Sequence, residues 1–300
     1  MPTREVDTTG WLHGTAGRIL QANGVEICAE TFGEVADPTI LLLGGVGSSL
    51  DWWEEDFCAR LAGAGRFVIR YDHRDTGRSV HYPVGETPYT LTDLADDALG
   101  LLDALGVGRA HLVGLSMGGW LSQLIALDHP ARVASLTLIA TTSAAGFSDA
   151  ETDLPGMTPA LGEAFAAMPE PPDWSDREAA IAYIVATERP LAGTHPFDEA
   201  TKRAIAARVV ARTADLAASA TNPYNIAPSA RWRERLGTIA APTLVLHGTA
   251  DALFPPGNGE ALAREIPGAR LQLLDGMGHE YPPRPLWDTV IPAIVAHTAG

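Results

Sequence analysis

The chain has 300 residues, of which 46% are hydrophobic and 19% are charged. These proportions exclude a disordered or fibrous protein, and the length suits two domains or one large domain with an insertion. Asp and Glu number 37 against 21 Lys and Arg, which gives a net charge of −16. Such an acidic chain lacks the basic surface that nucleic acids and anionic membranes require, so neither is expected as a partner.

Cysteine content and apolar patterning exclude further classes of protein. Cys28 and Cys58 are too few for a disulfide framework or a metal cage, and both are expected to be buried. No apolar run approaches the ~18 residues of a membrane span. Residues 1–18 also contain no uninterrupted apolar stretch typical of a secretion signal. We therefore expect a cytoplasmic protein.

In chain order, short apolar runs alternate with helical patterns, which is typical of a parallel sheet flanked by helices. Residues 18–34 predict a β-hairpin with Asn23-Gly24 at its turn. The later apolar runs are continuous, as in buried parallel strands, and lie at 40–44, 67–72, 110–116, 134–141, 242–248 and 269–276. Helices are expected between them, for example over 91–107, where Thr92 is the predicted cap, and over 118–130.

The segment from about 142 to 237 breaks this alternation. It is rich in alanine and helical in pattern, has prolines concentrated at 169–172, and contains no convincing buried strand. A block of this kind between two regular regions predicts an inserted helical cap. The expected organisation is a core formed by residues 1–141 and 238–300, with the cap over residues 142–237.

The sharpest local motif is Gly-Leu-Ser-Met-Gly at residues 114–118, a G-x-S-x-G pattern. It follows an apolar strand and opens a helical pattern, which is the strand–turn–helix setting of a nucleophile elbow. In that turn the hydroxyl of Ser116 would project from the end of the strand. Glycines on either side would let the strand and the helix approach closely. The motif predicts Ser116 as a nucleophile.

A serine nucleophile needs a base, and the base needs a carboxylate to orient it. His279 follows an apolar run in a glycine-flanked loop, and Asp251 follows another, so both are expected at the carboxyl edge of the sheet. Their order in the chain, Ser then Asp then His, is that of hydrolases with this kind of sheet. The rival histidines sit in settings that favour structural roles, and Asp275 is the rival acid; the histidines are His73, His111, His129 and His247.

Attack on an ester carbonyl creates an oxyanion that two backbone N–H groups must meet. One donor is expected at Met117, directly after the nucleophile, and the other in the loop after an early strand. Here that loop carries three glycines, of which Gly45 is the predicted donor. This chemistry requires neither a metal nor an organic cofactor.

With these motifs placed, the chain resembles the serine esterases of the α/β-hydrolase fold. The resemblance covers about residues 20–140 and 235–298, and it rests on the segments LLLGGVGSS, RYDHRDTGRS, HLVGLSMGG, LVLHGTADALFP and DGMGHE. Within that fold the chain is similar to the aclacinomycin methylesterase group, which shares the IRYDHRDTGRS and GLSMG runs. That group acts on the methyl esters of anthracycline polyketides.

The resemblance implies a mostly parallel sheet of the eight-stranded type, flanked by helices and covered by a cap. It implies Ser116 as nucleophile, Asp251 as acid and His279 as base. It also implies Gly45 and Met117 as oxyanion donors and a small-molecule ester as substrate. The charged turn over residues 72–79 is expected to be structural.

The sequence also provides candidates for the substrate pocket and alternatives to the reaction. The pocket candidates are four aromatic residues, namely Trp52, Trp53, Trp174 and Tyr224. Alternatives to ester hydrolysis are cofactor-free perhydrolysis, C–C bond hydrolysis, a lyase-type step, and a non-catalytic ligand-binding relative. Haloalkane dehalogenases and epoxide hydrolases are disfavoured because they place Asp where this chain has Ser116. The sequence predicts no oligomeric state.

Overall fold

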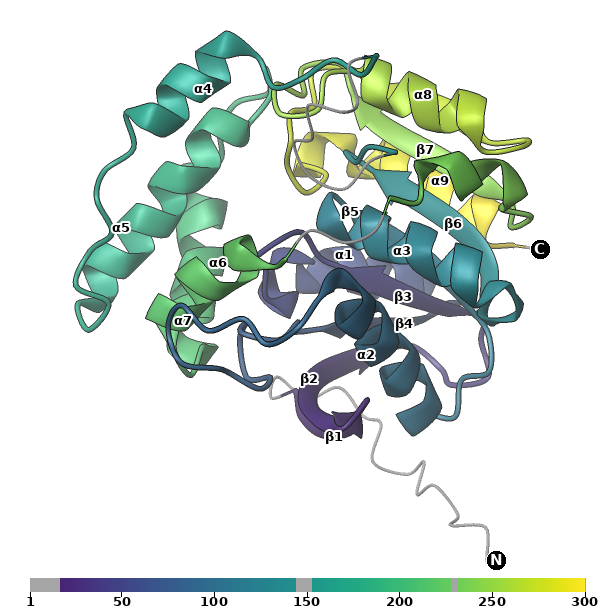
Figure 1. Ribbon diagram of the computed structural model, residues 1–300, viewed down its shortest axis with the longest axis horizontal. Helices are drawn as coiled ribbons and strands as arrows, with labels where there is room; N and C mark the ends of the chain where they lie inside the picture. The colour runs from purple at the N-terminus through teal and green to yellow at the C-terminus, as the bar shows by residue number, and fades with distance from the viewer. Residues whose placement is uncertain (1–16, 144–152, 228–230, 300) are drawn as a thin grey trace, which may run out of the picture.

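A computed structural model describes residues 17–143, 153–227 and 231–299 (Figure 1). Its centre is an eight-stranded sheet in the order β1-β2-β4-β3-β5-β6-β7-β8. The strands are β1 (Arg18–Ala22), β2 (Val25–Phe32), β3 (Thr39–Leu43), β4 (Phe67–Tyr71), β5 (Ala110–Leu115), β6 (Val133–Ile139), β7 (Thr243–Gly248) and β8 (Arg270–Leu274).

Most of the sheet is parallel. Strands β1 and β2 form an antiparallel hairpin, and β2 pairs antiparallel with β4. Every pairing from β4 through β3, β5, β6 and β7 to β8 is parallel. At the hairpin turn Asn23 and Gly24 both have positive φ, +48° and +78°, as a two-residue turn of this kind requires. The predicted hairpin and fold class are confirmed.

Helices cover both faces of the sheet (Figure 1). The side chains of strand β3 alternate between the two faces and so contact the helices on both sides of the sheet. Ile40 and Leu42 pack with α1 (Glu55–Gly63) and α9 (Trp287–His297). Leu41 and Leu43 pack on the other face, which is covered by α2 (Leu91–Ala104), α3 (Met117–Asp128) and α8 (Gly257–Glu265). A strand buried on both faces must be apolar throughout, which explains the continuous runs in the sequence.

The predicted cap of α2 was wrong by two residues. The N-cap is Thr90, not Thr92: the Asp93 N–H donates to the Thr90 hydroxyl at 3.3 Å. The Asp93 carboxylate in turn accepts from the Thr90 N–H at 2.8 Å. This reciprocal capping box satisfies two backbone donors, an arrangement that Thr92 cannot form because Ala95 stands three residues after it.

The described residues between β6 and β7 are helical, as the sequence predicts. They form α4 (Pro159–Ala166), α5 (Arg177–Glu188), α6 (Glu199–Arg212) and α7 (Leu216–Thr221), which gather on one side of the molecule in Figure 1. Helices α5 and α6 have a small core of their own, with Ile181 and Val185 against Ala206 and Val210. Among the described helices, none combines the length and apolar character that crossing a membrane would take.

Candidate active site

Ser116 stands alone between β5 and α3, in the sharp turn that the motif predicts. Its φ is +53° and its ψ is −116°, a strained backbone conformation for a residue with a side chain. The turn is tight because Gly114 and Gly118 lie against backbone: a methyl group on Gly118 would overlap the carbonyl of Leu43. The elbow places Ser116 at the carboxyl end of β5, in the middle of the sheet.

The structure brings Ser116, Asp251 and His279 together in one hydrogen-bonded chain. Nε2 of His279 lies 3.0 Å from the Ser116 hydroxyl oxygen, and Nδ1 lies 3.0 Å from a carboxylate oxygen of Asp251. Because a carboxylate can only accept, Nδ1 carries the proton and Nε2 is free to accept from the serine. All three side chains are buried. This arrangement can move a proton from the hydroxyl to the imidazole.

Asp251 is held firmly in this chain. Its second carboxylate oxygen accepts the N–H groups of Leu253 at 3.0 Å and Phe254 at 2.8 Å. The carbonyl of Phe254 also accepts a hydrogen bond from His247 at 2.7 Å, and burial lowers the pKa of His247. His247, a rival in the sequence, therefore supports the loop that carries the acid. The rival acid Asp275 follows β8 and has no contact with His279 among the described hydrogen bonds.

The other rival histidines also have structural surroundings. His73 donates from Nε2 to the carbonyl of Gly44 at 3.2 Å, and burial lowers its pKa to about 4. His73 is therefore neutral, and its hydrogen bond to Gly44 stabilises the loop after β3. His111 bonds to Ser135 on the neighbouring strand, and His129 ends α3.

The two predicted oxyanion donors lie on either side of the elbow. Met117 is the first residue of α3, so its N–H has no acceptor within the helix. Gly45 borders the same cavity as Ser116, and its N–H donates to the hydroxyl of Tyr281 at 3.0 Å. Tyr281 was not among the residues predicted from the sequence. Its position two residues after His279 is the only local signal that could have drawn attention to it.

A cavity of about 530 Å³ opens beside Ser116 and His279. The pocket candidates Trp52, Trp174 and Tyr224 line it. Trp53 does not line this cavity, because its side chain is buried and borders a neighbouring cavity instead. Other apolar side chains come from the inserted helices and the segments that join them, namely Phe165, Met168, Tyr183, Ile184, Leu191, Val209 and Leu216. The cavity thus lies between the sheet edge and these helices.

The charged turn over residues 72–79 is structural, as expected. The Asp72 carboxylate accepts the N–H groups of Leu50 at 2.7 Å and Arg78 at 2.9 Å. Arg212, at the end of α6, reaches across to pair with both Asp72 and Asp51. The sequence did not predict this contact, which ties an inserted helix to the loop that follows β3.

Most of the chain, residues 38–281, matches the family model for the α/β hydrolase fold. The chain belongs to the α/β-hydrolase family. Within it, the chain is 36% identical to the rhodomycin D methylesterase of Streptomyces sp. (strain C5) and 34% identical to that of Streptomyces peucetius. Each alignment covers 94% of this chain and 97% of the relative.

Solved structures of α/β hydrolases show the same fold. The enol-lactonase from Burkholderia xenovorans superposes with a TM-score of 0.72 at 28% identity, over 94% of this chain and 100% of that one. The alignments with both kinds of relative extend through the inserted helices. The similarity is therefore not confined to the sheet.

Proposed function

We propose that this α/β hydrolase is a serine esterase that cleaves the methyl ester of a polyketide-like molecule. The observation that carries the proposal is the hydrogen-bonded chain Ser116–His279–Asp251 at the mouth of an apolar cavity. The names of the two methylesterase relatives support the choice of ester. We also propose that residues 142–237 act as a cap on a core formed by residues 1–141 and 238–300.

In the first half of the proposed reaction, His279 takes the proton of Ser116 while the serine oxygen attacks the ester carbonyl. Asp251 holds the imidazole in the required tautomer and stabilises the imidazolium that forms. The N–H groups of Gly45 and Met117 bind the oxyanion, for which the substrate oxygen replaces the Tyr281 hydroxyl at Gly45. Methanol then leaves with the proton from His279, and an acyl-serine remains.

In the second half, water attacks the acyl-serine with His279 again as base, and the acid product and free Ser116 are released. All bonds are made and broken by the substrate, water and this chain's own side chains. The product is a carboxylate, whereas the methyl ester is neutral. In a protein of net charge −16, repulsion favours release of the product over release of the ester.

The size and lining of the cavity suit a large, flat, apolar acyl group. Its volume of about 530 Å³ is within the range of pockets that enclose drug-sized molecules. Trp52, Trp174, Tyr183 and Tyr224 supply aromatic surfaces for stacking on fused rings. A methyl group is the smallest alcohol part an ester can have, so nearly all of this volume is available to the acid part.

The test is a substrate panel run on the wild type and on two serine variants. We expect a polycyclic aromatic methyl ester to be cleaved with a higher kcat/KM than 4-nitrophenyl acetate or a simple lactone. Ser116→Ala should lose several orders of magnitude in kcat. Ser219→Ala is the matched control, because Ser219 lines the same cavity without contacting His279, and it should retain activity. Full activity of Ser116→Ala would disprove the proposal.

A further inference from the structure

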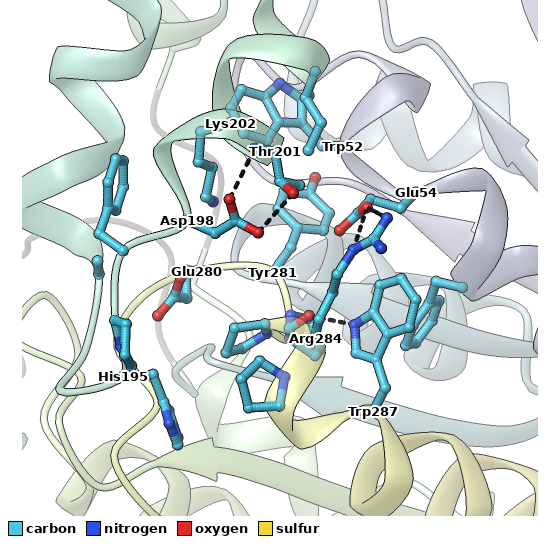
Figure 2. A pocket seen from close by; sticks show the side chains of 18 of the residues that line it. Trp52, Glu54, His195, Asp198, Thr201, Lys202, Glu280, Tyr281, Arg284 and Trp287 are labelled. Atoms are coloured by element: carbon cyan, nitrogen blue, oxygen red, sulfur yellow. Dashed lines mark hydrogen bonds and ion pairs between the residues drawn. The ribbon is translucent and has the colours of Figure 1, made fainter.

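A second cavity, of about 480 Å³, lies beside the first (Figure 2). It is bordered by residues 192–198, the first turns of α6, and residues 280–287, which follow the catalytic histidine candidate. Trp52, Glu280 and Tyr281 line both cavities and so form their common wall. Ser116 and His279 border only the first cavity. The second cavity is therefore not part of the reaction proposed above.

Aromatic rings make up much of the second cavity. Trp52 stacks on Tyr281 with ring centres 6.0 Å apart, and Trp53 meets the same tyrosine edge-on at 4.9 Å. Phe57 and Trp287 meet edge-on at 5.5 Å and continue the cluster, because Phe57 also lies 5.7 Å from Trp53. Three prolines, Pro282, Pro283 and Pro285, stiffen the adjoining loop. Rings packed on one another form a rigid, preformed site that suits a flat ring.

Both cationic side chains that border the cavity, Lys202 and Arg284, have an ion-pair partner. Arg284 pairs with Glu54 at 2.7 Å, and Lys202 pairs with Glu188 at 3.0 Å. Asp198 is exposed and caps α6. Glu280, by contrast, is only 7% exposed and accepts a hydrogen bond from the Gly193 N–H at 3.0 Å.

No lysine, arginine or histidine among the described residues forms an ion pair with Glu280. Figure 2 shows the Glu280 side chain on the same side of the cavity as His195, away from Arg284 and Trp287. Burying a carboxylate without a counter-ion costs free energy. A cation that binds beside Glu280 would therefore be strongly attracted to its carboxylate, because no ion pair of the protein has to be broken first.

We propose that the second cavity binds an aromatic ammonium ion. The ring packs against this aromatic cluster, and the ammonium group donates to Glu280. The rings of this cavity attract cations, since the chain's own Lys202 lies 5.2 Å from the ring centre of Trp52 and Arg284 lies 5.1 Å from that of Trp287. The acidic protein as a whole also draws cations to its surface. The ligand contacts Tyr281 from the second cavity, which Ser116 does not border, so its binding does not depend on ester hydrolysis.

Isothermal titration calorimetry with tryptamine tests the binding. Indole-3-propionate is the matched probe, because it carries the same ring with an anionic group. We expect tryptamine to bind with a stoichiometry of one and at least ~10-fold more tightly than indole-3-propionate. Glu280→Gln keeps the acceptor for Gly193 and should weaken tryptamine binding ~10-fold or more. Equal affinity for the two probes, or no tryptamine binding at millimolar concentration, would overturn the proposal.

Two filling variants distinguish the cavities. Ala192→Phe fills only the second cavity and should abolish tryptamine binding, whereas Ala220→Phe fills only the first and should leave it intact. The opposite pattern would place the amine beside Ser116 and refute the inference. Thr201→Phe fills the second cavity from α6 and replaces Ala192→Phe if thermal unfolding shows that variant to be destabilised. Loss of esterase activity in Ser116→Ala bears only on the proposed function, since tryptamine carries no ester.

Discussion

Replacing Asp251 by Asn tests the direction of the hydrogen bonds in the candidate triad. One oxygen of Asp251 accepts two backbone N–H groups, from Leu253 and Phe254, and the other faces His279 Nδ1 at 3.0 Å. In the variant the amide oxygen must keep the two backbone donors, because an NH2 group cannot accept them. The NH2 group therefore points at His279, which must then present Nδ1 as an acceptor and carry its proton on Nε2.

A proton on Nε2 prevents His279 from accepting the proton of Ser116. In serine proteases the same exchange lowers kcat by about four orders of magnitude, because the imidazole is held in the wrong tautomer. That factor corresponds to about 5 kcal/mol in the barrier. We expect a loss of this size here, with little change in KM, because Asp251 does not line the substrate cavity.

The assay is steady-state hydrolysis of 4-nitrophenyl acetate, with thermal unfolding to confirm that the variant is folded. Asp275→Asn is the matched control: it removes the rival acid, which follows β8 but does not contact His279, and it should remain active. If Asp251→Asn lost less than ~10-fold in kcat, the tautomer argument would be refuted.

Three further predictions concern other buried groups. Tyr281→Phe frees the Gly45 N–H for the oxyanion, so kcat/KM should rise by a factor of about 2 to 10, and a large fall would show that the hydroxyl is needed to hold the loop. Burial lowers the pKa of His73 to about 4, so its contribution to stability is complete above pH ~6.5 and is lost as the pH falls towards 4. In urea unfolding, the free energy of unfolding of the wild type should fall by up to ~3 kcal/mol more than that of His73→Gln when the pH is lowered from ~6.5 to 4. An equal fall in the two proteins would contradict this. Burial raises the pKa values of Cys28 and Cys58 to about 12, so Ellman's reagent at pH 8 should label them only after unfolding, and rapid labelling of the folded protein would contradict the structure.

The sheet and the elbow were predictable because their signals are local. A strand buried on both faces must be apolar at every position, and the order of such runs in the chain places each loop at the same edge. The elbow needs small residues around Ser116, and the motif places glycines two residues before and two residues after it. The correct cap of α2 was also within reach, because Thr90 and Asp93 have the spacing of a capping box.

What the sequence did not predict depends on contacts between distant segments. The pairing of Arg212 with Asp51 and Asp72 joins residues 161 and 140 positions apart. Trp52 and Trp53 are adjacent, yet the turn directs only Trp52 into the cavity beside Ser116. The Tyr281–Gly45 bond joins residues 236 positions apart, and no composition or periodicity indicates it.

The central claim is that Ser116 is the nucleophile, and covalent trapping tests it most directly. A fluorophosphonate reacts with a serine activated by a neighbouring histidine and forms an adduct that water does not remove. Mass spectrometry of the digested protein should place one adduct on Ser116, formed in proportion to the loss of esterase activity. Loss of activity with Ser116 unmodified, or modification of Ser116 with activity retained, would contradict the account.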